Sequence, residues 1–232
     1  TGARMTLPAE AETLRRSPWL AAQPADFAQA LLDAAQWREI DIGTTFNIGG
    51  DAAGGIWGLA RGQVDVASAV SAPDTPLGDI YLPGQWAGIG PIFGQTRAGD
   101  CVARLPSLIA QLPRVRLLAL LEAHPAWWQC IGALAVALTF RYGGAAGDLL
   151  IRDPRRRVVA VLLRLGNCRW NDPEAPVSIV FTQDQIAAAA NLSRHPAGAI
   201  LRDLEACGLL AIGYRSLTIR DAAALRAIAD GG

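Results

Sequence analysis

Apolar residues near the C-terminus follow first a helical and then a strand-like period. Thr182 followed three residues later by Gln185 forms a capping box, which predicts the start of a helix. Ser193 is a good N-cap for a second helix that begins at Arg194 and ends at Gly208. One face of this second helix is apolar, and its residues recur at helical spacing: Ala197, Ile200, Leu201 and Leu204.

Two short strands are expected after the second helix. Residues 209–212 and 216–219 alternate around the turn formed by residues 213–215. A helix-turn-helix followed by a β wing places its second helix in the DNA major groove. Two-helix spacing alone fits a helical hairpin without a DNA role equally well. Three features together favour DNA binding: the capping box, the wing, and the presence of Arg194 and His195 in the first turn of the second helix.

This segment resembles the C-terminal domain of Crp/Fnr-type transcription regulators. The positions that match the pattern of that family are Ser193, Arg194, Leu201, Leu204, Glu205, Gly208 and Leu209. His195 stands where the family often has a base-contacting Glu, and Ala199 where it often has a second base-contacting Arg. The resemblance therefore implies a DNA contact at Arg194, but not the usual target sequence.

The resemblance and the helix positions together predict a set of DNA contacts. Thr182 and Gln183, at the start of the first helix, are expected to hold phosphate. The residues expected to face the groove are Ser193, Arg194, His195, Ala197 and Gly198. The residues expected to contact the DNA backbone are Arg202, Arg215 and Ser216.

The chain upstream changes to short alternating segments separated by glycine. Residues 1–17 are expected to be loose, and residues 24–35 to form a helix. From Trp37 to Leu112, turn signals every eight to twelve residues predict an antiparallel barrel or jelly roll. The strands expected there include 38–42, 56–60, 62–66 and 108–112.

Part of this region resembles a cyclic-nucleotide-binding fold. The matching positions are Gly50, Asp51, Trp57, Gly62 and Val64. Residues 82–88 resemble the strand and turn that lead into the phosphate-binding cassette. The resemblance places the ligand-binding candidates at Gly88, Ile89, Arg97 and Ala98.

The cassette departs from the family pattern at several positions. Ile89 replaces the Glu that accepts a hydrogen bond from ribose, Ala98 replaces the Ser after Arg97, and Pro91 interrupts the short helix. Loss of a hydrogen bond to a charged group costs roughly 1.5–3 kcal/mol. We therefore expect another small-molecule effector, of unknown identity, or none. The two histidines, His124 and His195, suggest no pair of haem ligands, and no cofactor is assigned.

An apolar run at residues 126–140 follows a predicted helix at 114–123. It is shorter than the roughly 20 residues of a membrane span, which favours a buried or dimer helix. The resemblance implies that this helix is the dimer interface. Four residues spaced by four, three and four would line one face: Trp127, Ile131, Leu134 and Leu138. Three glycines beyond the run suggest a kink or a close helix crossing: Gly143, Gly144 and Gly147.

Residues 152–157, with three consecutive arginines, are expected to form the hinge. After the hinge we expect a helix at 158–165, a strand at 177–181 and a final helix at 222–229. The arginines could contact DNA phosphate, or they could form a solvated helix start with one structural salt bridge.

The charge distribution supports a division into two modules. The 232 residues carry a formal net charge of zero, and every basic residue is Arg. Residues 152–220 have ten arginines and six acids, whereas the rest of the chain has eleven and fifteen. This asymmetry fits a mildly basic DNA module joined to an acidic sensor, although a solvated charged face would give the same count.

The four cysteines lie far apart, at positions 101, 130, 168 and 207, with no Cys-x-x-Cys spacing. They predict no metal site and no disulfide framework, but four buried thiols in a reducing cytosol. The N-terminus has no long apolar run, so no signal peptide is expected.

These observations predict an α+β fold in three parts. Residues 1–123 form an antiparallel barrel or jelly roll, 124–152 a long dimerisation helix and hinge, and 153–232 a winged helix-turn-helix domain. The predicted function is that of a dimeric, cytoplasmic transcription regulator, activator or repressor, with a sensor barrel and no catalytic or metal-binding residues. Its predicted partners are double-stranded DNA and a second copy, with RNA polymerase as a further candidate and no membrane.

Two alternatives remain open at this point. One is a DNA-binding protein that responds to no ligand and uses the barrel as a scaffold. The other is a cupin-like small-molecule-binding protein, which would need a metal cluster that two distant histidines do not favour.

Overall fold

The computed structural model describes residues 8–52, 54–68 and 79–231. Contacts divide the chain into two compact units. The first unit comprises Thr1–Pro73 and Ile80–Thr139, and the second comprises Asp74–Asp79 and Phe140–Gly232. The division at Thr139 falls inside the helix Trp128–Leu150.

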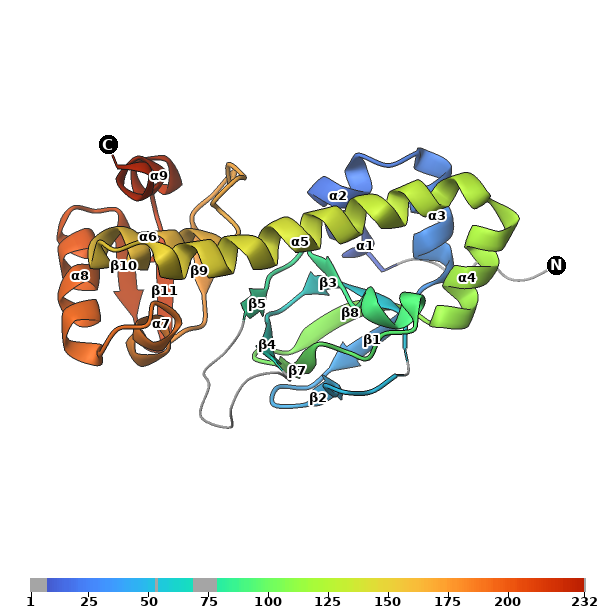
Figure 1. Cartoon of the computed structure of the whole chain (residues 1–232), viewed down its shortest axis with the longest axis horizontal. Coiled ribbons are helices and arrows are strands. Elements are labelled where there is room, and N and C mark those ends of the chain that lie inside the picture. Colours follow the sequence, from blue (N-terminus) through green and yellow to red (C-terminus); the bar gives the residue numbers. More distant parts are fainter. Residues whose placement is uncertain (1–7, 53, 69–78, 232) are drawn as a thin grey trace. The chain divides into compact units, whose positions relative to one another are not determined.

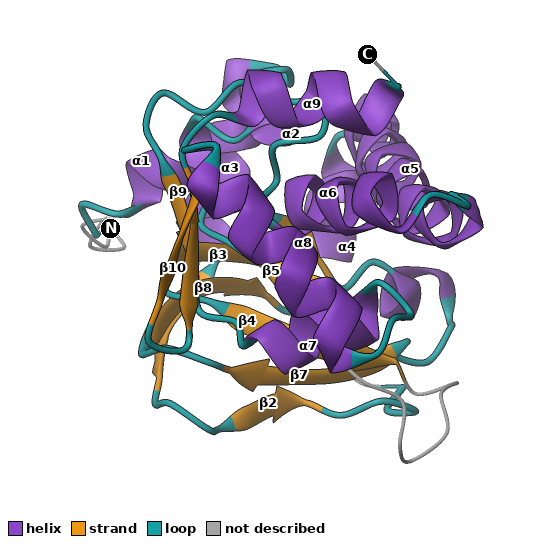
Figure 2. Ribbon diagram, turned by 90° about the vertical axis from the view of Figure 1, so that its left-hand side faces the viewer, coloured by secondary structure: helices purple, strands orange, loops and turns teal. Residues whose placement is uncertain are grey.

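Two antiparallel four-stranded sheets form the body of the first unit (Figures 1 and 2). One sheet has the order β1 (Gln36–Ile40), β8 (Ser107–Leu112), β3 (Ile56–Arg61) and β6 (Trp86–Ala87). The other has the order β2 (Thr45–Asn47), β7 (Gly99–Ala103), β4 (Val64–Ser68) and β5 (Asp79–Tyr81). The short strands and glycine turns thus form the antiparallel barrel that the sequence predicts.

Side chains from both sheets pack together in the interior of this barrel. Trp57 is 2% exposed and Tyr81 is 1% exposed. The Trp57 ring lies edge-on to Phe46 and tilted against Tyr81, with both centroid distances at 5.2 Å. Aliphatic residues complete this core: Ile40, Leu59, Val64 and Ile109. An aromatic cluster thus occupies the space between the sheets.

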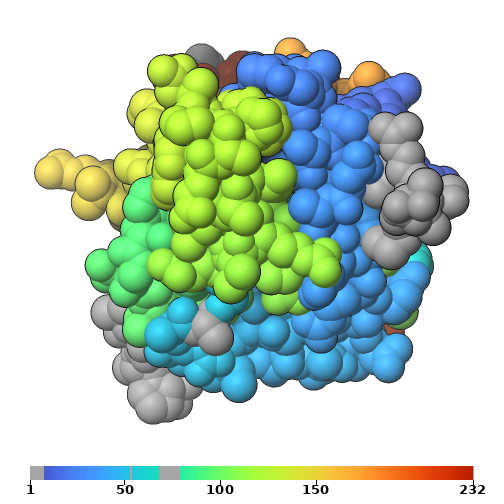
Figure 3. Space-filling view, turned by 90° about the vertical axis from the view of Figure 1, so that its right-hand side faces the viewer, coloured from blue at the N-terminus to red at the C-terminus, as the bar shows by residue number. Residues whose placement is uncertain are grey.

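Helices cover the outside of the barrel and form a second core. Before β1 lie α1 (Ala11–Arg15), α2 (Pro18–Ala21) and α3 (Ala25–Ala34); after β8 lie α4 (Arg114–Ala123), the 3₁₀ turn η2 (Pro125–Trp127) and α5 (Trp128–Leu150). Figure 3 shows the N-terminal helices in blue beside α4 and the start of α5 in yellow-green. The expectation that residues 1–17 are loose is wrong for α1, because Leu14 is fully buried in this core.

Trp19 joins three parts of the first unit. Its Nε1 donates a 2.9 Å hydrogen bond to the carbonyl oxygen of Cys130 on α5. Its ring lies edge-on to Trp86 of β6, with the centroids 5.2 Å apart. This tryptophan therefore connects α2 to both the barrel and the long helix.

Helix α5 is longer than the apolar run that predicts it. Its 23 residues extend through Gly143, Gly144 and Gly147 without a break. A Cβ on Gly144 would lie 2.7 Å from the Trp170 ring, so the glycine makes room for that indole. Among the described residues, Pro125–Leu150 is the one helical segment long and apolar enough to cross a membrane by length and composition.

The second unit is built around α6 (Pro154–Leu165). Residues 158–165 of this helix are all buried. Around it lie β9 (Val177–Ile179), α7 (Gln183–Ala189), α8 (Arg194–Ala206), β10 (Leu210–Gly213), β11 (Ser216–Ile219) and α9 (Ala222–Asp230). The three strands form an antiparallel sheet in the order β10-β11-β9. Helices on a small hairpin sheet form the winged arrangement that the sequence predicts.

The arginines at the start of α6 make structural contacts. Asp153 caps the helix by accepting a 2.7 Å hydrogen bond from the Arg156 backbone N–H. The Arg156 guanidinium donates to the carbonyl of Ala229, and Arg157 donates to the carbonyl of Ala190. These two side chains therefore secure α6 to α9 and to the end of α7.

Four charged side chains form a buried network in the second unit. Arg164 lies 3.2 Å from Asp79 and 2.9 Å from Asp148, measured between nitrogen and oxygen. Arg141 donates to both oxygens of Asp79, from Nη2 to Oδ1 at 3.0 Å and from Nε to Oδ2. The exposed fractions of the four side chains are 4–11%. Burial raises the pKa of Asp148, and the neighbouring Arg164 opposes that shift.

Three of the four cysteines are buried as expected, whereas Cys207 is exposed. Cys207 is the C-cap of α8, where its position at the helix end leaves the thiol in solvent. Burial raises the pKa of the Cys101 and Cys168 thiols to about 11. These two thiols are therefore protonated at neutral pH.

We expect Arg164→Ala to destabilise the second unit by about 3–5 kcal/mol, because it leaves two buried carboxylates without their shared cation. Urea denaturation followed by far-UV circular dichroism measures this change. Arg155→Ala is the matched control: Arg155 forms a partly exposed 3.7 Å pair with Asp203. Its loss should cost less than about 1 kcal/mol. Equal effects of the two substitutions would show that the buried network contributes no special stability.

Candidate nucleic-acid interface

The two helices of the helix-turn-helix begin and end where local chemistry predicts. The Gln185 backbone N–H donates to Thr182 Oγ1 at 3.2 Å, and the Thr182 N–H donates to Gln185 Oε1 at 2.9 Å. This confirms the capping box of α7. Ser193 has the N-cap conformation before α8, but its side chain makes no capping hydrogen bond. Gly208, with φ of +75°, follows the end of α8.

The buried face of α8 includes two of the residues expected in the groove. Ala197 is fully buried with Leu201 and Leu204. Gly198 is also buried, and a Cβ there would lie 3.5 Å from Gln183 Oε1. Ala197 and Gly198 therefore lie on the side of α8 that faces the rest of the domain, where small side chains permit close packing.

The first turn of α8 presents charged and polar groups to solvent. Ser193, Arg194 and His195 are exposed, and Arg202 is exposed two turns later. The Arg194 side chain is 80% exposed, and its Nε lies 3.0 Å from Oδ1 of Asp184 on α7. The sequence reasoning did not identify Asp184, although its place in the first turn of α7 brings it near the start of α8.

The β10–β11 hairpin forms the wing beside these helices. Gly213 pairs with Ser216, so Tyr214 and Arg215 form the two-residue turn. Arg215 has a φ of +52°, and Tyr214 is 93% exposed. Glu205 of α8 accepts a 2.7 Å hydrogen bond from the Ile212 N–H, which fixes the wing to α8. Tyr214 was not among the predicted contacts; a lone aromatic residue in a polar turn was its only sequence signal.

A hollow of about 340 Å³ lies between the start of α7 and the wing. Thr182 and Gln183 line one side, Arg215 and Ser216 the other, and Arg194 also borders it. The lining thus combines two guanidinium groups with hydroxyl and amide donors and with one carboxylate, that of Asp184, which pairs with Arg194. Such a set suits phosphate and sugar oxygens, because charged and neutral donors both contact the DNA backbone.

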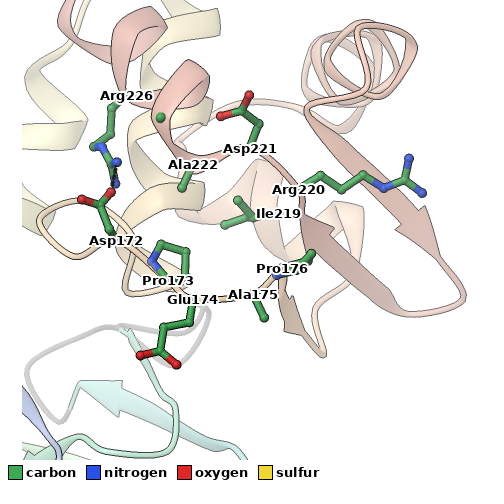
Figure 4. Close-up of a pocket in the computed structure, with 11 residues that line it drawn as sticks. Asp172, Pro173, Glu174, Ala175, Pro176, Ile219, Arg220, Asp221, Ala222 and Arg226 are labelled. Atoms are coloured by element: carbon green, nitrogen blue, oxygen red, sulfur yellow. Dashed lines mark hydrogen bonds and ion pairs between the residues drawn. The ribbon is translucent and has the colours of Figure 1, made fainter.

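A second hollow of about 280 Å³ lies between the loop after α6 and the start of α9 (Figure 4). Its lining contains the carboxylates of Asp172, Glu174 and Asp221. Arg226 forms an ion pair with Asp172, and Asp221 accepts a hydrogen bond from the Ala224 N–H to cap α9. Arg220 and Arg226 also line this hollow, but the three carboxylates outnumber these two guanidinium groups, which makes it a poor site for a phosphate.

The cassette candidates of the first unit are divided between two environments. Gly88 has a φ of +87°, and a Cβ there would lie 2.8 Å from the Gly55 carbonyl oxygen and 3.0 Å from Trp57. Arg97 is 8% exposed, and its guanidinium lies where a Cβ on Gly54 would be. Gly88 and Arg97 therefore both meet the Gly54–Gly55 turn. Burial lowers the pKa of Arg97, while Cys101 and Asp51 act in the opposite direction.

The other two cassette candidates point elsewhere. Ile89 packs against the core formed with the N-terminal helices, and Ala98 is exposed. Pro91 lies in the first turn of the 3₁₀ helix η1 (Gly90–Phe93), so the expectation that it interrupts a helix is wrong. A proline is tolerated there because the first N–H groups of a helix have no partner inside it. Within the described residues, no group of three or more His, Cys, Asp or Glu could hold a metal ion.

The four residues predicted to form a dimer interface are buried within the first unit. Trp127, Ile131, Leu134 and Leu138 are 0–8% exposed and belong to the core with α1–α3. Another face of α5 is exposed and apolar, with Val136 at 54%, Phe140 at 70% and Leu150 at 82%. The helix therefore has two apolar faces, of which one already has a partner.

Residues 156–228 match the family model of the Crp-like helix-turn-helix domain. No curated protein matches the sequence. A protein of Ruegeria pomeroyi described as a cyclic nucleotide binding protein has a similar structure, with 19% identity and a TM-score of 0.68 over 98% of this chain and 100% of that one. The c-di-GMP-responsive global regulator CLP of Xanthomonas campestris is 23% identical, with a TM-score of 0.63 over 85% and 99% of the two chains.

A third similar structure is a protein of Eubacterium rectale described as a transcriptional regulator of the Crp/Fnr family. It is 13% identical, with a TM-score of 0.61 over 92% of this chain and 98% of that one. These identities show a shared fold. The C-terminal domain is thus a Crp-like helix-turn-helix domain, and the whole chain has the fold of Crp/Fnr-family regulators, which confirms the resemblance found in the sequence.

Proposed function

We propose that this chain, whose C-terminal domain is a Crp-like helix-turn-helix, is a cytoplasmic, homodimeric, sequence-specific transcription regulator rather than an enzyme. The observation that carries the proposal is the exposed first turn of α8, with Arg194 and His195, beside the hollow and the wing. The proposed parts are a barrel over residues 1–123, a dimerisation helix and hinge over 124–152 and a DNA-binding domain over 153–232.

The proposed interface divides into base-reading and backbone-holding residues. Arg194 and His195 would meet base edges in the major groove, where arginine donates two hydrogen bonds to guanine. Five other side chains would hold phosphate or sugar: Thr182, Gln183, Arg202, Arg215 and Ser216. Tyr214, at the wing tip, joins this backbone group because its ring and hydroxyl are exposed. Ser193 lies at the groove edge, and the buried Ala197 and Gly198 allow α8 to approach α7.

The exposed face of α5 is the proposed dimer interface. Residues at alternating steps of four and three lie along it: Gln129, Ala133, Val136, Phe140, Gly143, Gly147 and Leu150. This is the spacing of a coiled-coil seam, and its small residues let two helices approach closely. Trp127, Ile131, Leu134 and Leu138 would then hold α5 to its own barrel, so that each copy presents the helix in a fixed rotation.

A second copy explains this apolar face better than a membrane does. The opposite side of α5 is packed in the first unit, and Arg141 and Asp148 near its C-terminus belong to the buried charge network. A bilayer would surround the helix with lipid and leave these charges in hydrocarbon, at high cost. A partner helix needs only the one face that is exposed.

The proposed mechanism is a shift between two arrangements of the dimer. A change in the barrel would alter how α5 meets its partner and thereby the separation of the two α8 helices. Two half-sites one helical turn apart would suit such a dimer. Promoter DNA is the main proposed partner, and RNA polymerase a further one.

The packing of the barrel supports an effector other than a cyclic nucleotide. Trp57 and Tyr81 are buried in the interior, and a Cβ on Gly88 would lie 3.0 Å from the Trp57 ring. Ile89 offers no acceptor for a ribose hydroxyl, and Arg97 lies against Gly54. The second candidate function, a ligand-independent regulator with the barrel as scaffold, rests on this same packing of buried aromatic side chains.

Arg194→Ala is expected to weaken specific retardation of a DNA duplex selected from a randomised library by the unaltered protein, by about 5- to 150-fold for each half-site. Loss of one bidentate guanine contact costs about 1–3 kcal/mol of discrimination. Gel retardation against the selected duplex and a shuffled duplex measures the loss. Arg155→Ala removes the same charge at α6 and should retain specific binding. Unchanged binding by Arg194→Ala would show that the recognition helix is wrongly placed.

Phe140→Glu is expected to convert the dimer into a monomer, because a carboxylate would be buried in the seam of the two α5 helices. Light scattering coupled to size-exclusion chromatography measures the mass. Val115→Glu is the matched control, since Val115 is 77% exposed on α4, away from the seam. A Phe140→Glu protein that remains dimeric would exclude this face of α5 as the interface.

Millimolar cyclic AMP or cyclic GMP is expected to leave the melting temperature unchanged. A ligand at one hundred times its Kd would stabilise the folded state by about 2.7 kcal/mol, which amounts to several degrees for a chain of this size. Differential scanning fluorimetry with the selected DNA duplex as positive control checks the expectation. A rise of several degrees with either nucleotide would contradict a nucleotide-free barrel.

A further inference from the structure

The ion pair between α7 and α8 engages only one edge of the Arg194 guanidinium. Asp184 Oδ1 meets Nε at 3.0 Å. Among the described residues, no hydrogen bond or ion pair engages Nη1 or Nη2 of Arg194, and the side chain is 80% exposed. The two terminal nitrogens therefore have no partner among the described residues, while the Asp184 carboxylate lies at the Nε edge in an exposed ion pair.

This arrangement matches what guanine recognition requires of an arginine. The guanidinium is a rigid planar fork with five donors. Guanine accepts two hydrogen bonds in the major groove, at O6 and N7, and arginine supplies them as a bidentate pair. A carboxylate on the Nε edge leaves Nη1 and Nη2 for the base. It also restricts the rotamers of a long exposed side chain, whose freedom would otherwise be lost on binding.

The carboxylate also changes the cost of incorrect contacts. If Arg194 turned to a phosphate, it would leave Asp184 and place that carboxylate beside the negatively charged DNA backbone. Repulsion of this kind penalises sequences on which Arg194 cannot remain paired with Asp184. Asp184 would thus lower the affinity of the protein for DNA of any sequence, while it favours the contact of Arg194 with guanine.

Arg194 carries an unusual share of the base reading in this helix. It is the only arginine between residues 194 and 201, and Ala199 has no side chain that could reach a base. His195 is the other exposed polar group of the first turn. The orientation of one guanidinium therefore has a large effect on sequence preference.

We propose that Asp184 is a positioning residue that holds Arg194 for bidentate recognition of a guanine and discourages its contact with phosphate. This inference rests on the proposed function, because it presumes that α8 enters the major groove. It assigns to the first turn of α7 a role in sequence selection, beyond its predicted role in phosphate binding.

The test compares Asp184→Ala, Arg194→Ala and the unaltered full-length protein. The probes are the selected duplex, a set of duplexes with each base pair substituted singly, and a shuffled duplex. We expect Arg194→Ala to remove the preference for guanine at one base pair of each half-site. Asp184→Ala should reduce the preference at that same base pair, within the range of about 5- to 150-fold that such a contact supplies. Its binding to shuffled DNA should be equal or tighter.

Three further measurements separate positioning from a general structural effect. Asp184→Glu, which keeps the carboxylate, should restore part of the guanine preference. Asp184→Ala in the Arg194→Ala background should cause no additional loss at that base pair. Asp203→Ala removes an exposed acid that pairs with Arg155 on α6, and it should retain the full preference. A merely structural role of Asp184 would instead lower affinity at all positions and lower the melting temperature.

Two outcomes would overturn the inference and can be told apart. If Asp184→Ala kept the full guanine preference while Arg194→Ala lost it, Asp184 would have no positioning role and the proposed function would stand. If Arg194→Ala also kept every base preference, the placement of α8 in the groove would be wrong, and the role of Asp184 would fail with it.

Discussion

The packing of the second unit depends on a network of four charged side chains that are almost completely buried. Asp79, Arg141, Asp148 and Arg164 balance one another, and each cation has a carboxylate partner. Such a network is tolerable only when it is complete, because one missing member leaves an unpaired buried charge. It fixes α6 against the last turns of α5. Since α6 in turn packs against α7, α8 and α9, the position of α8, the proposed recognition helix, follows from the same constraint.

Local chemistry was sufficient to predict the winged helix-turn-helix from the sequence. The capping box at Thr182, the N-cap position of Ser193 and the glycine after α8 each act within one helical turn, so their spacing shows them directly. The alternating strands and glycine turns of the barrel were predictable for the same reason. These features depend on residues close together in the chain, and here expectation and structure agree to within a few residues.

Features that depend on tertiary packing could not be predicted in this way. Helix α5 is apolar on two faces, and spacing alone could not tell which one the barrel covers. The helix at Ala11–Arg15 exists because Leu14 is buried by residues far away in sequence. The charge network joins positions 79, 141, 148 and 164, and no motif links them. The Asp184–Arg194 pair spans the turn between two helices, so it too became visible only in the fold.

The proposed DNA surface owes its positive charge to arginine alone, since the chain contains no lysine. A guanidinium keeps its proton throughout the physiological pH range, and acetylation, which neutralises lysine, has no target among these side chains. The charge of Arg194, Arg202 and Arg215 is therefore constant under acetylating conditions that would neutralise a lysine-rich surface. In the proposed dimer, control over DNA binding would then come through geometry, by the distance and angle at which its two DNA surfaces are presented.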